Sequence, residues 1–195
     1  MPLKPLAEYE LMAAQAHGHL CAGQILGLRM ALHGVKLLGL DDPAGKDRKR
    51  LVSFVEIDRC MTDAIGVVTG CRLGKRALKF RDFGKAAATF CDLQENRAVR
   101  IAARESSKER ARALYPEITD KNQQQMHAYR EMPDEDLFAV EWVRVTIGAE
   151  DLPGYKGPRV VCVQCGEGVS FRREVIHKGR PLCRACAGDG YYDPA

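Results

Sequence analysis

The cysteines near the C-terminus have the type and spacing to bind a metal ion. They form two pairs, Cys162-x2-Cys165 and Cys183-x2-Cys186, on either side of the polar stretch 166–182. A CxxC turn places two thiolates on one side of a metal, and a second such turn closes a tetrahedral zinc site. The stretch between the pairs has too few apolar residues for its own core, so metal ligation would supply its folding energy. A disulfide framework is the alternative interpretation.

A second set of cysteines and histidines lies in the first half of the chain. His17 and Cys21 stand four residues apart, so a helical path would place them on one face. Cys60 follows an expected strand, and Cys71 comes just after the next expected helix. Thiolates with imidazole suit Zn, Ni or Cu, or iron–sulfur chemistry. We therefore expect His17 and Cys21, together with at least one of Cys60 and Cys71, to hold a core metal, with His19 as a ligand or as a partner of a ligand.

Each of these residues also has a plain structural interpretation. Cysteine is a common buried residue, and Cys60 or Cys71 alone would belong to the core more often than to a metal site. His17 or His19 alone would serve as a helix cap. Cys91 lies in an apolar run and is expected in the core.

The same residues are compatible with an enzyme. A thiolate at Cys21, activated by His17 or His19, would be a nucleophile, and a core metal with an open position would activate water. Asp63 lies three residues after Cys60 and would face the same way if a helix starts there. The sequence has no Walker or Rossmann glycine motif that would identify a substrate.

Composition narrows the class of protein. The 195 residues are 46% hydrophobic, which is enough for one core and a small appendage. No apolar run approaches the length of a transmembrane helix, and the N-terminus lacks the apolar run of a signal peptide. We therefore expect a cytoplasmic protein with no membrane contact, where thiols stay reduced. The net charge of +4 is too mild to indicate nucleic-acid binding on its own.

Hydrophobic periodicity predicts helices and strands that alternate without a repeated βαβ pattern. Helices are expected at 6–17, 20–38, 61–68 and 123–130, at a turn from 134, and after the capping box Ser106-x-x-Glu109. Strands are expected at 51–57, 78–83, 86–93, 98–103 and 140–147. We therefore assign 1–150 to an α+β domain with an antiparallel or mixed sheet, followed by a linker at 151–158 and a treble-clef-like zinc finger at 159–192.

Small residues follow one side of the second expected helix. Gly23, Gly27 and Ala31 recur at four-residue intervals, so another backbone can approach closely. The partner would be an element of the same chain or a second copy of it.

Four short motifs together resemble one known family. They read HGHLCAG at 17–23, DRCMTDAI at 58–65, TGCRLGK at 69–75 and DFGKA at 82–86. In this order they resemble the FmdE family, named for the E component of molybdenum or tungsten formylmethanofuran dehydrogenase operons, over roughly residues 10–145. Ala22 stands where the family often has proline and Arg72 where it usually has threonine, and neither change removes a ligand-type side chain. The resemblance implies an α+β core that forms intertwined homodimers, to which some members append a zinc finger.

Three functions are compatible with these observations. The first is a metal-binding accessory protein for a molybdenum or tungsten enzyme, or for another redox metalloenzyme, with structural Zn²⁺ in the finger and a second metal in the core. The second is a regulator or metal sensor whose finger contacts a protein or nucleic acid through Arg172, Arg173, Lys178, Arg180 and Arg184. The third is an enzyme that uses the Cys/His site. The family's tie to the dehydrogenase is by operon, so the resemblance assigns no catalytic role.

Overall fold

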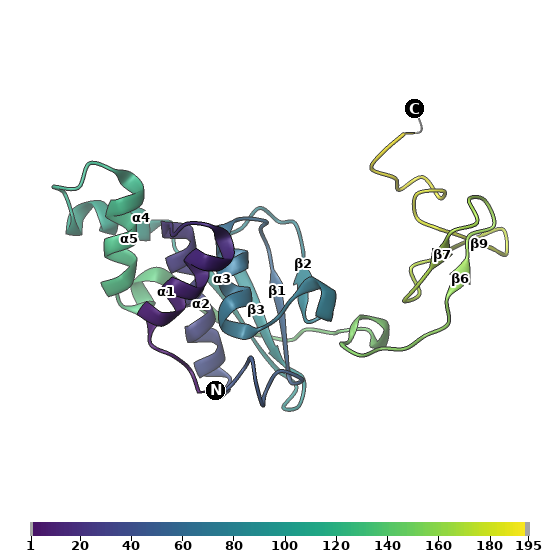
Figure 1. The fold of residues 1–195 in the computed structure, drawn as a ribbon, viewed down its shortest axis with the longest axis horizontal. Coiled ribbons are helices and arrows are strands. Elements are labelled where there is room, and N and C mark those ends of the chain that lie inside the picture. The colour runs from purple at the N-terminus through teal and green to yellow at the C-terminus, as the bar shows by residue number, and fades with distance from the viewer. Residues whose placement is uncertain (1, 194–195) are drawn as a thin grey trace. The chain divides into compact units, whose positions relative to one another are not determined.

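The computed structural model describes residues 2–193, and the chain forms two compact units that divide between Val145 and Thr146. We call the first the core unit and the second the finger unit. Figure 1 shows the long helices and the main sheet in the core unit, and short strands joined by irregular loops in the finger unit. No helix in the described part of the chain is long and apolar enough to cross a membrane.

A five-stranded sheet forms the centre of the core unit. Its strands are β1 (Leu51–Val55), β2 (Leu78–Phe80), β3 (Ala87–Asp92), β4 (Arg97–Ala103) and β5 (Phe138–Val143). They lie in the order β2-β1-β3-β4-β5. β1 and β2 pair in parallel, and the other neighbours pair antiparallel. The predicted α+β class is therefore confirmed, and of the two predicted sheet types the structure has the mixed one.

Helices cover the sheet and extend beyond it. They are α1 (Leu6–His17), α2 (Ala22–Leu37), α3 (Cys60–Thr69), α4 (Ser106–Leu114), α5 (Lys121–Glu131), the one-turn α6 (Asp134–Leu137) and the 3-10 turn η1 (Leu73–Lys75). A second 3-10 turn, η2 (Ala149–Asp151), belongs to the finger unit. α2 contacts β3 and β4, and α3 contacts β1. α1 packs on both of these helices, while α4 and α5 pack on each other at one end of the unit (Figure 1).

Glycines set how closely α2 packs. A Cβ added to Gly27 would lie 2.5 Å from the carbonyl oxygen of Met61 in α3, and one added to Gly34 would collide with the ring of Phe90 in β3. Ala31 is fully buried on the same helix. The predicted close approach at Gly23, Gly27 and Ala31 is therefore made within the chain, chiefly to α3.

The starts of α4 and α5 differ from each other. Ser106 is already the first helical residue of α4, and no side chain caps that helix start. The predicted capping box of Ser106 and Glu109 is therefore wrong, because its serine lies one position too far along. α5 has the cap that the sequence analysis missed, since the Asp120 carboxylate accepts a hydrogen bond from the Gln123 N–H at 2.7 Å.

Arg29 of α2 holds the end of α5 in place. Its guanidinium donates to the carbonyl oxygens of Tyr129 at 2.7 Å and Met132 at 2.8 Å, and to the Asp134 carboxylate at 2.6 Å. The His33 ring reaches the same carboxylate at 2.8 Å. Hydrogen bonds from His33 first and then Arg29 lower the pKa of Asp134 to about 2, although burial opposes the shift.

The strands of the finger unit form two short hairpins. β6 (Val160–Val161) pairs with β7 (Gly168–Val169), and β8 (Val175–His177) pairs with β9 (Arg180–Leu182). Turns follow from Cys183 onward, and no helix forms between there and Asp193, the last described residue. This unit begins at Thr146, before the predicted linker at 151–158 and the predicted finger at 159–192.

Candidate metal centres

The two hairpins of the finger unit bring its four cysteines to one point. β6 leads into Cys162 and β9 leads into Cys183. Gly166 adopts a left-handed φ of 77°, and its N–H donates to the Cys162 carbonyl at 3.0 Å, which closes a tight turn around Cys165. The Sγ atoms of these three cysteines and of Cys186 all lie within 4.8 Å of one another. This spacing fits one tetrahedral ion with metal–sulfur bonds of about 2.3 Å.

The thiols of this cluster differ in acidity. Backbone hydrogen bonds, first at Cys165 and then at Cys183, lower the pKa of Cys162 to about 6. A side-chain hydrogen bond with Cys183 raises the pKa of Cys186 to about 12. Four thiolates at this spacing would repel one another, and a bound divalent cation removes that repulsion. The chemistry of the cluster therefore agrees with its geometry as a metal site.

The structure places His17 and Cys21 on two different helices. α1 ends at His17, where Gly18 turns the chain with a left-handed φ of 95°. Cys21 has extended backbone angles and precedes the first residue of α2. The expectation that a helical path puts both residues on one face is therefore wrong, because the chain between them is not helical.

Cys21 and Cys60 lie beside each other at the starts of two packed helices. Cys21 precedes α2, and Cys60 is the first residue of α3. A Cβ added to Gly23 would lie 3.5 Å from the Cys60 Cβ and 3.8 Å from the Cys21 Sγ. Burial first, then a hydrogen bond and the charge of Cys21, raises the pKa of Cys60. The structure thus brings together two of the residues predicted for the core site.

Asn122 supports this thiol pair from a distant part of the chain. Its Oδ1 accepts a hydrogen bond at 2.9 Å from the N–H of Ala22, the first helical residue of α2. The cysteine at position 21 makes no side-chain cap at this helix. Sequence reasoning missed Asn122, and no local pattern could have found it, because 100 residues separate it from Ala22.

His17 is held by a carboxylate. Its Nδ1–H donates to the Oδ2 of Asp63 at 2.8 Å, and the two side chains are 21% and 60% exposed. This contact settles the ring orientation and leaves Nε2 as the atom for a metal or a ligand. The His19 ring centroid lies 5.0 Å from that of His17, and His19 is exposed. Asp63, which the sequence analysis noted only as a neighbour, is thus a partner of His17.

Cys71 occupies a different place from the other core cysteines. It is 2% exposed and contacts the Ser53 hydroxyl at 3.5 Å, and burial raises its pKa. Its carbonyl packs against Gly66, which is about 9 Å further along the axis of α3 than Cys60. Cys71 is thus a packed core thiol, and its convergence with Cys60 on one metal stays a prediction.

Outside the finger cluster, residues 2–193 contain no other group of three or more His, Cys, Asp or Glu side chains close enough to hold a metal ion. The core unit instead offers two pairs, the thiols of Cys21 with Cys60 and the imidazole of His17 with Asp63. Ligation by both pairs would require side-chain movement.

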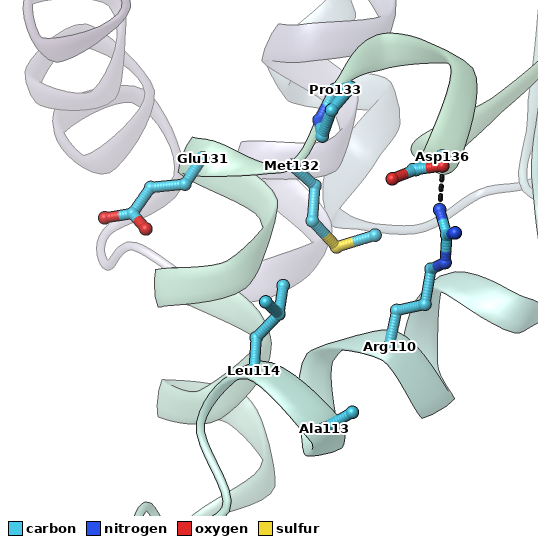
Figure 2. A pocket seen from close by; sticks show the side chains of 7 residues that line it. All are labelled: Arg110, Ala113, Leu114, Glu131, Met132, Pro133 and Asp136. Atoms are coloured by element: carbon cyan, nitrogen blue, oxygen red, sulfur yellow. Dashed lines mark ion pairs between the residues drawn. The ribbon is translucent and has the colours of Figure 1, made fainter.

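Cavities of the core unit lie beside these residues and elsewhere. One of about 300 Å³ has Asp63, Cys71 and Arg72 among its lining residues. A larger one, of about 420 Å³, lies between α4 and the end of α5 (Figure 2). In Figure 2 Leu114 and Met132 form its apolar part, and the ion pair of Arg110 with Asp136 closes one side. None of the predicted site residues lines this second cavity.

Comparison with models of known protein families gives a match to much of the core unit. The sequence model described as "FmdE, Molybdenum formylmethanofuran dehydrogenase operon" matches residues 16–139, which include both core pairs. The chain belongs to the FmdE family. The resemblance inferred from the four motifs is thereby confirmed.

Two relatives show how far the likeness of this FmdE-family chain extends. A protein of Archaeoglobus fulgidus, described as a probable S-adenosyl-L-methionine-binding protein, is 31% identical over 217 residues, with 97% of this chain and 55% of that protein covered. The chain thus spans about half the length of that relative. The crystal structure of a tungsten formylmethanofuran dehydrogenase FmdE-like protein from Syntrophus aciditrophicus matches with a TM-score of 0.66 and 21% identity, covering 96% of this chain and 94% of that one. At this identity the second likeness shows the fold.

Proposed function

We propose that this FmdE-family chain is a metal-binding accessory protein of a molybdenum or tungsten enzyme, or of another redox metalloenzyme. The observation that carries the proposal is the finger cluster, in which four cysteine sulfurs lie within 4.8 Å of one another. The family description and the name of the related crystal structure supply the class of enzyme.

Zinc is the metal proposed for the finger. Zinc has no redox chemistry, accepts four thiolates in tetrahedral geometry, and typically supplies the folding energy of such segments. The two hairpins of this unit are two and three residues per strand. Strands this short bury little apolar surface, which supports a structural role for the ion.

A second metal is proposed for the core unit, with Cys21, Cys60 and His17 as its ligands. Zn, Ni and Cu are the candidates, because soft thiolates together with imidazole favour them over Mg or Ca. The contact between Asp63 and Nδ1 of His17 supports this set, since metal-bound histidines usually donate their other ring N–H to a carboxylate. Cys71 is left out of this set, because its thiol is buried against the Ser53 hydroxyl.

Metal counting on the purified full-length chain tests both sites. We expect two metals per chain in the wild type, and one each in Cys21→Ser and Cys183→Ser. Cys91→Ser is the matched control, because Cys91 is a buried strand thiol outside both sets. A wild type that holds a single metal, lost in Cys183→Ser and kept in Cys21→Ser, would remove the core site from the proposal.

Asp63→Asn tests whether His17 is a metal ligand that is positioned by the Asp63 carboxylate. The amide keeps the size of the side chain and removes its charge, so the core site should lose about 10- to 100-fold in metal affinity while the finger keeps its metal. Unchanged affinity at the core site would mean that His17 is not a ligand there.

A homodimer is also proposed, and it rests on the family resemblance. The row of Gly23, Gly27 and Ala31 gives it no support, since that row packs within the chain. Light scattering at micromolar concentration tests the proposal, and a mass of 21.6 kDa, that of one chain, would contradict it. A reducing cytoplasm is the proposed compartment, which agrees with eight unpaired thiols.

Nucleic-acid binding by the finger receives little support from the described side chains. Of the five cations noted for it, Arg173 pairs with Asp151 and Arg184 with Asp189 inside the finger unit. Ion-paired arginines are less available to phosphates. Salt-dependent binding of the chain to single- or double-stranded DNA would favour the nucleic-acid function over the accessory function.

A further inference from the structure

The close packing of α2 on α3 places two thiols against each other. Gly23 follows Cys21 by two residues, and the position of its missing Cβ is within ordinary contact distance of both the Cys21 Sγ and the Cys60 Cβ. The Cys21 sulfur and the Cys60 side chain therefore border the same small space beside Gly23. A disulfide between them would need Cβ atoms about 3.5–4.5 Å apart. No metal is required for the two thiols to meet.

Burial distinguishes this pair from the other thiols of the core unit. Cys71 is 2% and Cys91 is 4% exposed, whereas Cys21 and Cys60 are half-buried. A reagent in solution therefore reaches the pair and not the deep thiols. Both members also lie at helix starts beside irregular chain, where small backbone shifts can adjust the bond geometry.

We propose that Cys21 and Cys60 form a reversible disulfide within one chain on reaction with a low-molecular-weight disulfide. The thiolate of one cysteine attacks a sulfur of the reagent, which forms a mixed disulfide and releases one thiolate. The second cysteine attacks the protein sulfur of that mixed disulfide, which forms the Cys21–Cys60 bond and releases the second thiolate. The protein loses two electrons and two protons, and the reagent is reduced to two thiols.

This inference stands apart from the core metal and opposes it. A disulfide sulfur is no longer a thiolate ligand, so oxidation of the pair would exclude a metal that depends on Cys21 and Cys60. The core site would then be occupied only in the reduced protein.

Peptide mapping of the full-length, zinc-loaded chain tests the bond. Cleavage after Arg29, Arg59 and Arg72 separates Cys21 into one peptide and places Cys60 with Cys71 in another. After treatment with oxidised glutathione, we expect these two peptides to be joined, with the loss of two hydrogens per chain. Cys71→Ser should keep the cross-link, Cys60→Ser should lose it, and dithiothreitol should reverse it.

The outcomes distinguish the disulfide from the core metal. Stable glutathione adducts on both cysteines without a cross-link, a cross-link through Cys71, or a cross-link between two chains would each overturn the proposed disulfide. Added Zn²⁺ at ten times the core-site Kd should slow the reaction about tenfold if the pair binds the metal. An equal rate with and without Zn²⁺ would leave the disulfide in place and contradict the core metal site.

Discussion

The finger unit and the core unit hold their cysteines by different means. In the finger, four sulfurs meet at the ends of two hairpins whose strands are two and three residues long, and Cys162 is the buried member of the set. In the core, the thiols of Cys21 and Cys60 meet because two helices of 16 and 10 residues pack closely through glycine. In the finger unit, metal binding by the cysteines is expected to hold the segment folded. In the core unit, the packing of the helices brings the two thiols together.

This difference separates what each region loses when it is perturbed. A finger without metal keeps little buried apolar surface, so its structure and its metal should be lost together. The core has a cluster of fully buried side chains, including Ile25, Leu28 and Phe90, so it should stay folded when its thiols are changed. Each prediction below tests one side of this comparison.

Loss of the finger metal should have the largest effect. Structural zinc contributes about 10–16 kcal/mol of apparent binding free energy, which a chain with so small a core cannot replace. We expect Cys183→Ser or chelation to make 159–190 sensitive to protease while the helical circular dichroism of the core unit is retained. Cys91→Ala, which removes a thiol outside the cluster, is the control. A finger that resists protease without metal would show that it does not need the ion to fold, which would contradict this difference between the two units.

The contact between α2 and α3 should be the part of the core unit that is most sensitive to substitution. Gly27→Ala places a methyl group 2.5 Å from the Met61 carbonyl oxygen, which is backbone and cannot move aside cheaply. We expect a loss of about 1–3 kcal/mol in unfolding free energy. Gly23→Ala is the matched control, since its contacts at 3.5 and 3.8 Å are ordinary and alanine favours helix.

Denaturant unfolding followed by fluorescence measures this difference. Trp142 is the single tryptophan of the chain and lies in β5, so the signal reports on the core unit alone. Equal unfolding midpoints for Gly27→Ala and Gly23→Ala would show that α2 packs less tightly on α3 than described. Close helix packing would then no longer explain why the two thiols lie together.

Acid should lower the stability of the core unit by a smaller amount than the changes above. The folded-state pKa of Asp134 is lowered to about 2, so the stability from its contacts with His33 and Arg29 is present above about pH 4 and is lost as the pH falls toward 2. With 34% of the side chain exposed, screening by water reduces this contribution to about 1–2 kcal/mol. Asp134→Asn should lower core stability by that amount at pH 7 and by little near pH 2, with Asp58→Asn on the exposed surface as the control.

The finger should respond to acid first. Thiols have higher ordinary pKa values than carboxylates, so protons displace the metal before they reach the ion pairs of the core. Zinc release and Trp142 fluorescence, followed in one titration, should therefore give two transitions. A single transition would indicate that the two units unfold together.

Local patterns made much of this molecule predictable. The CxxC pairs were readable because each ligand pair is set by one turn, and the helix from Leu6 to His17 matched its predicted bounds because Gly18 ends it with a left-handed angle. Alternation of apolar residues indicated the five strands of the main sheet but left open whether that sheet is antiparallel or mixed. The FmdE motifs indicated the family, which the match over 16–139 then confirmed.

Long-range geometry accounts for what the sequence could not show. The distance between Cys60 and Cys71 depends on the length of α3, which simple spacing along the chain does not convey. The row of small residues on α2 left open whether α3 or a second copy fills it. The pairing of His17 with Asp63 joins residues 46 positions apart, and its presence required the observed packing of α1 on α3.

The hydrogen bond from Ala22 to Asn122 has a consequence for the newly made chain. The ribosome adds roughly 5–20 residues per second, and 100 residues separate donor from acceptor. Between about 5 and 20 s therefore pass after the start of α2 is synthesised before its distant cap exists. During that interval the start of α2 beside Cys21 lacks this hydrogen bond.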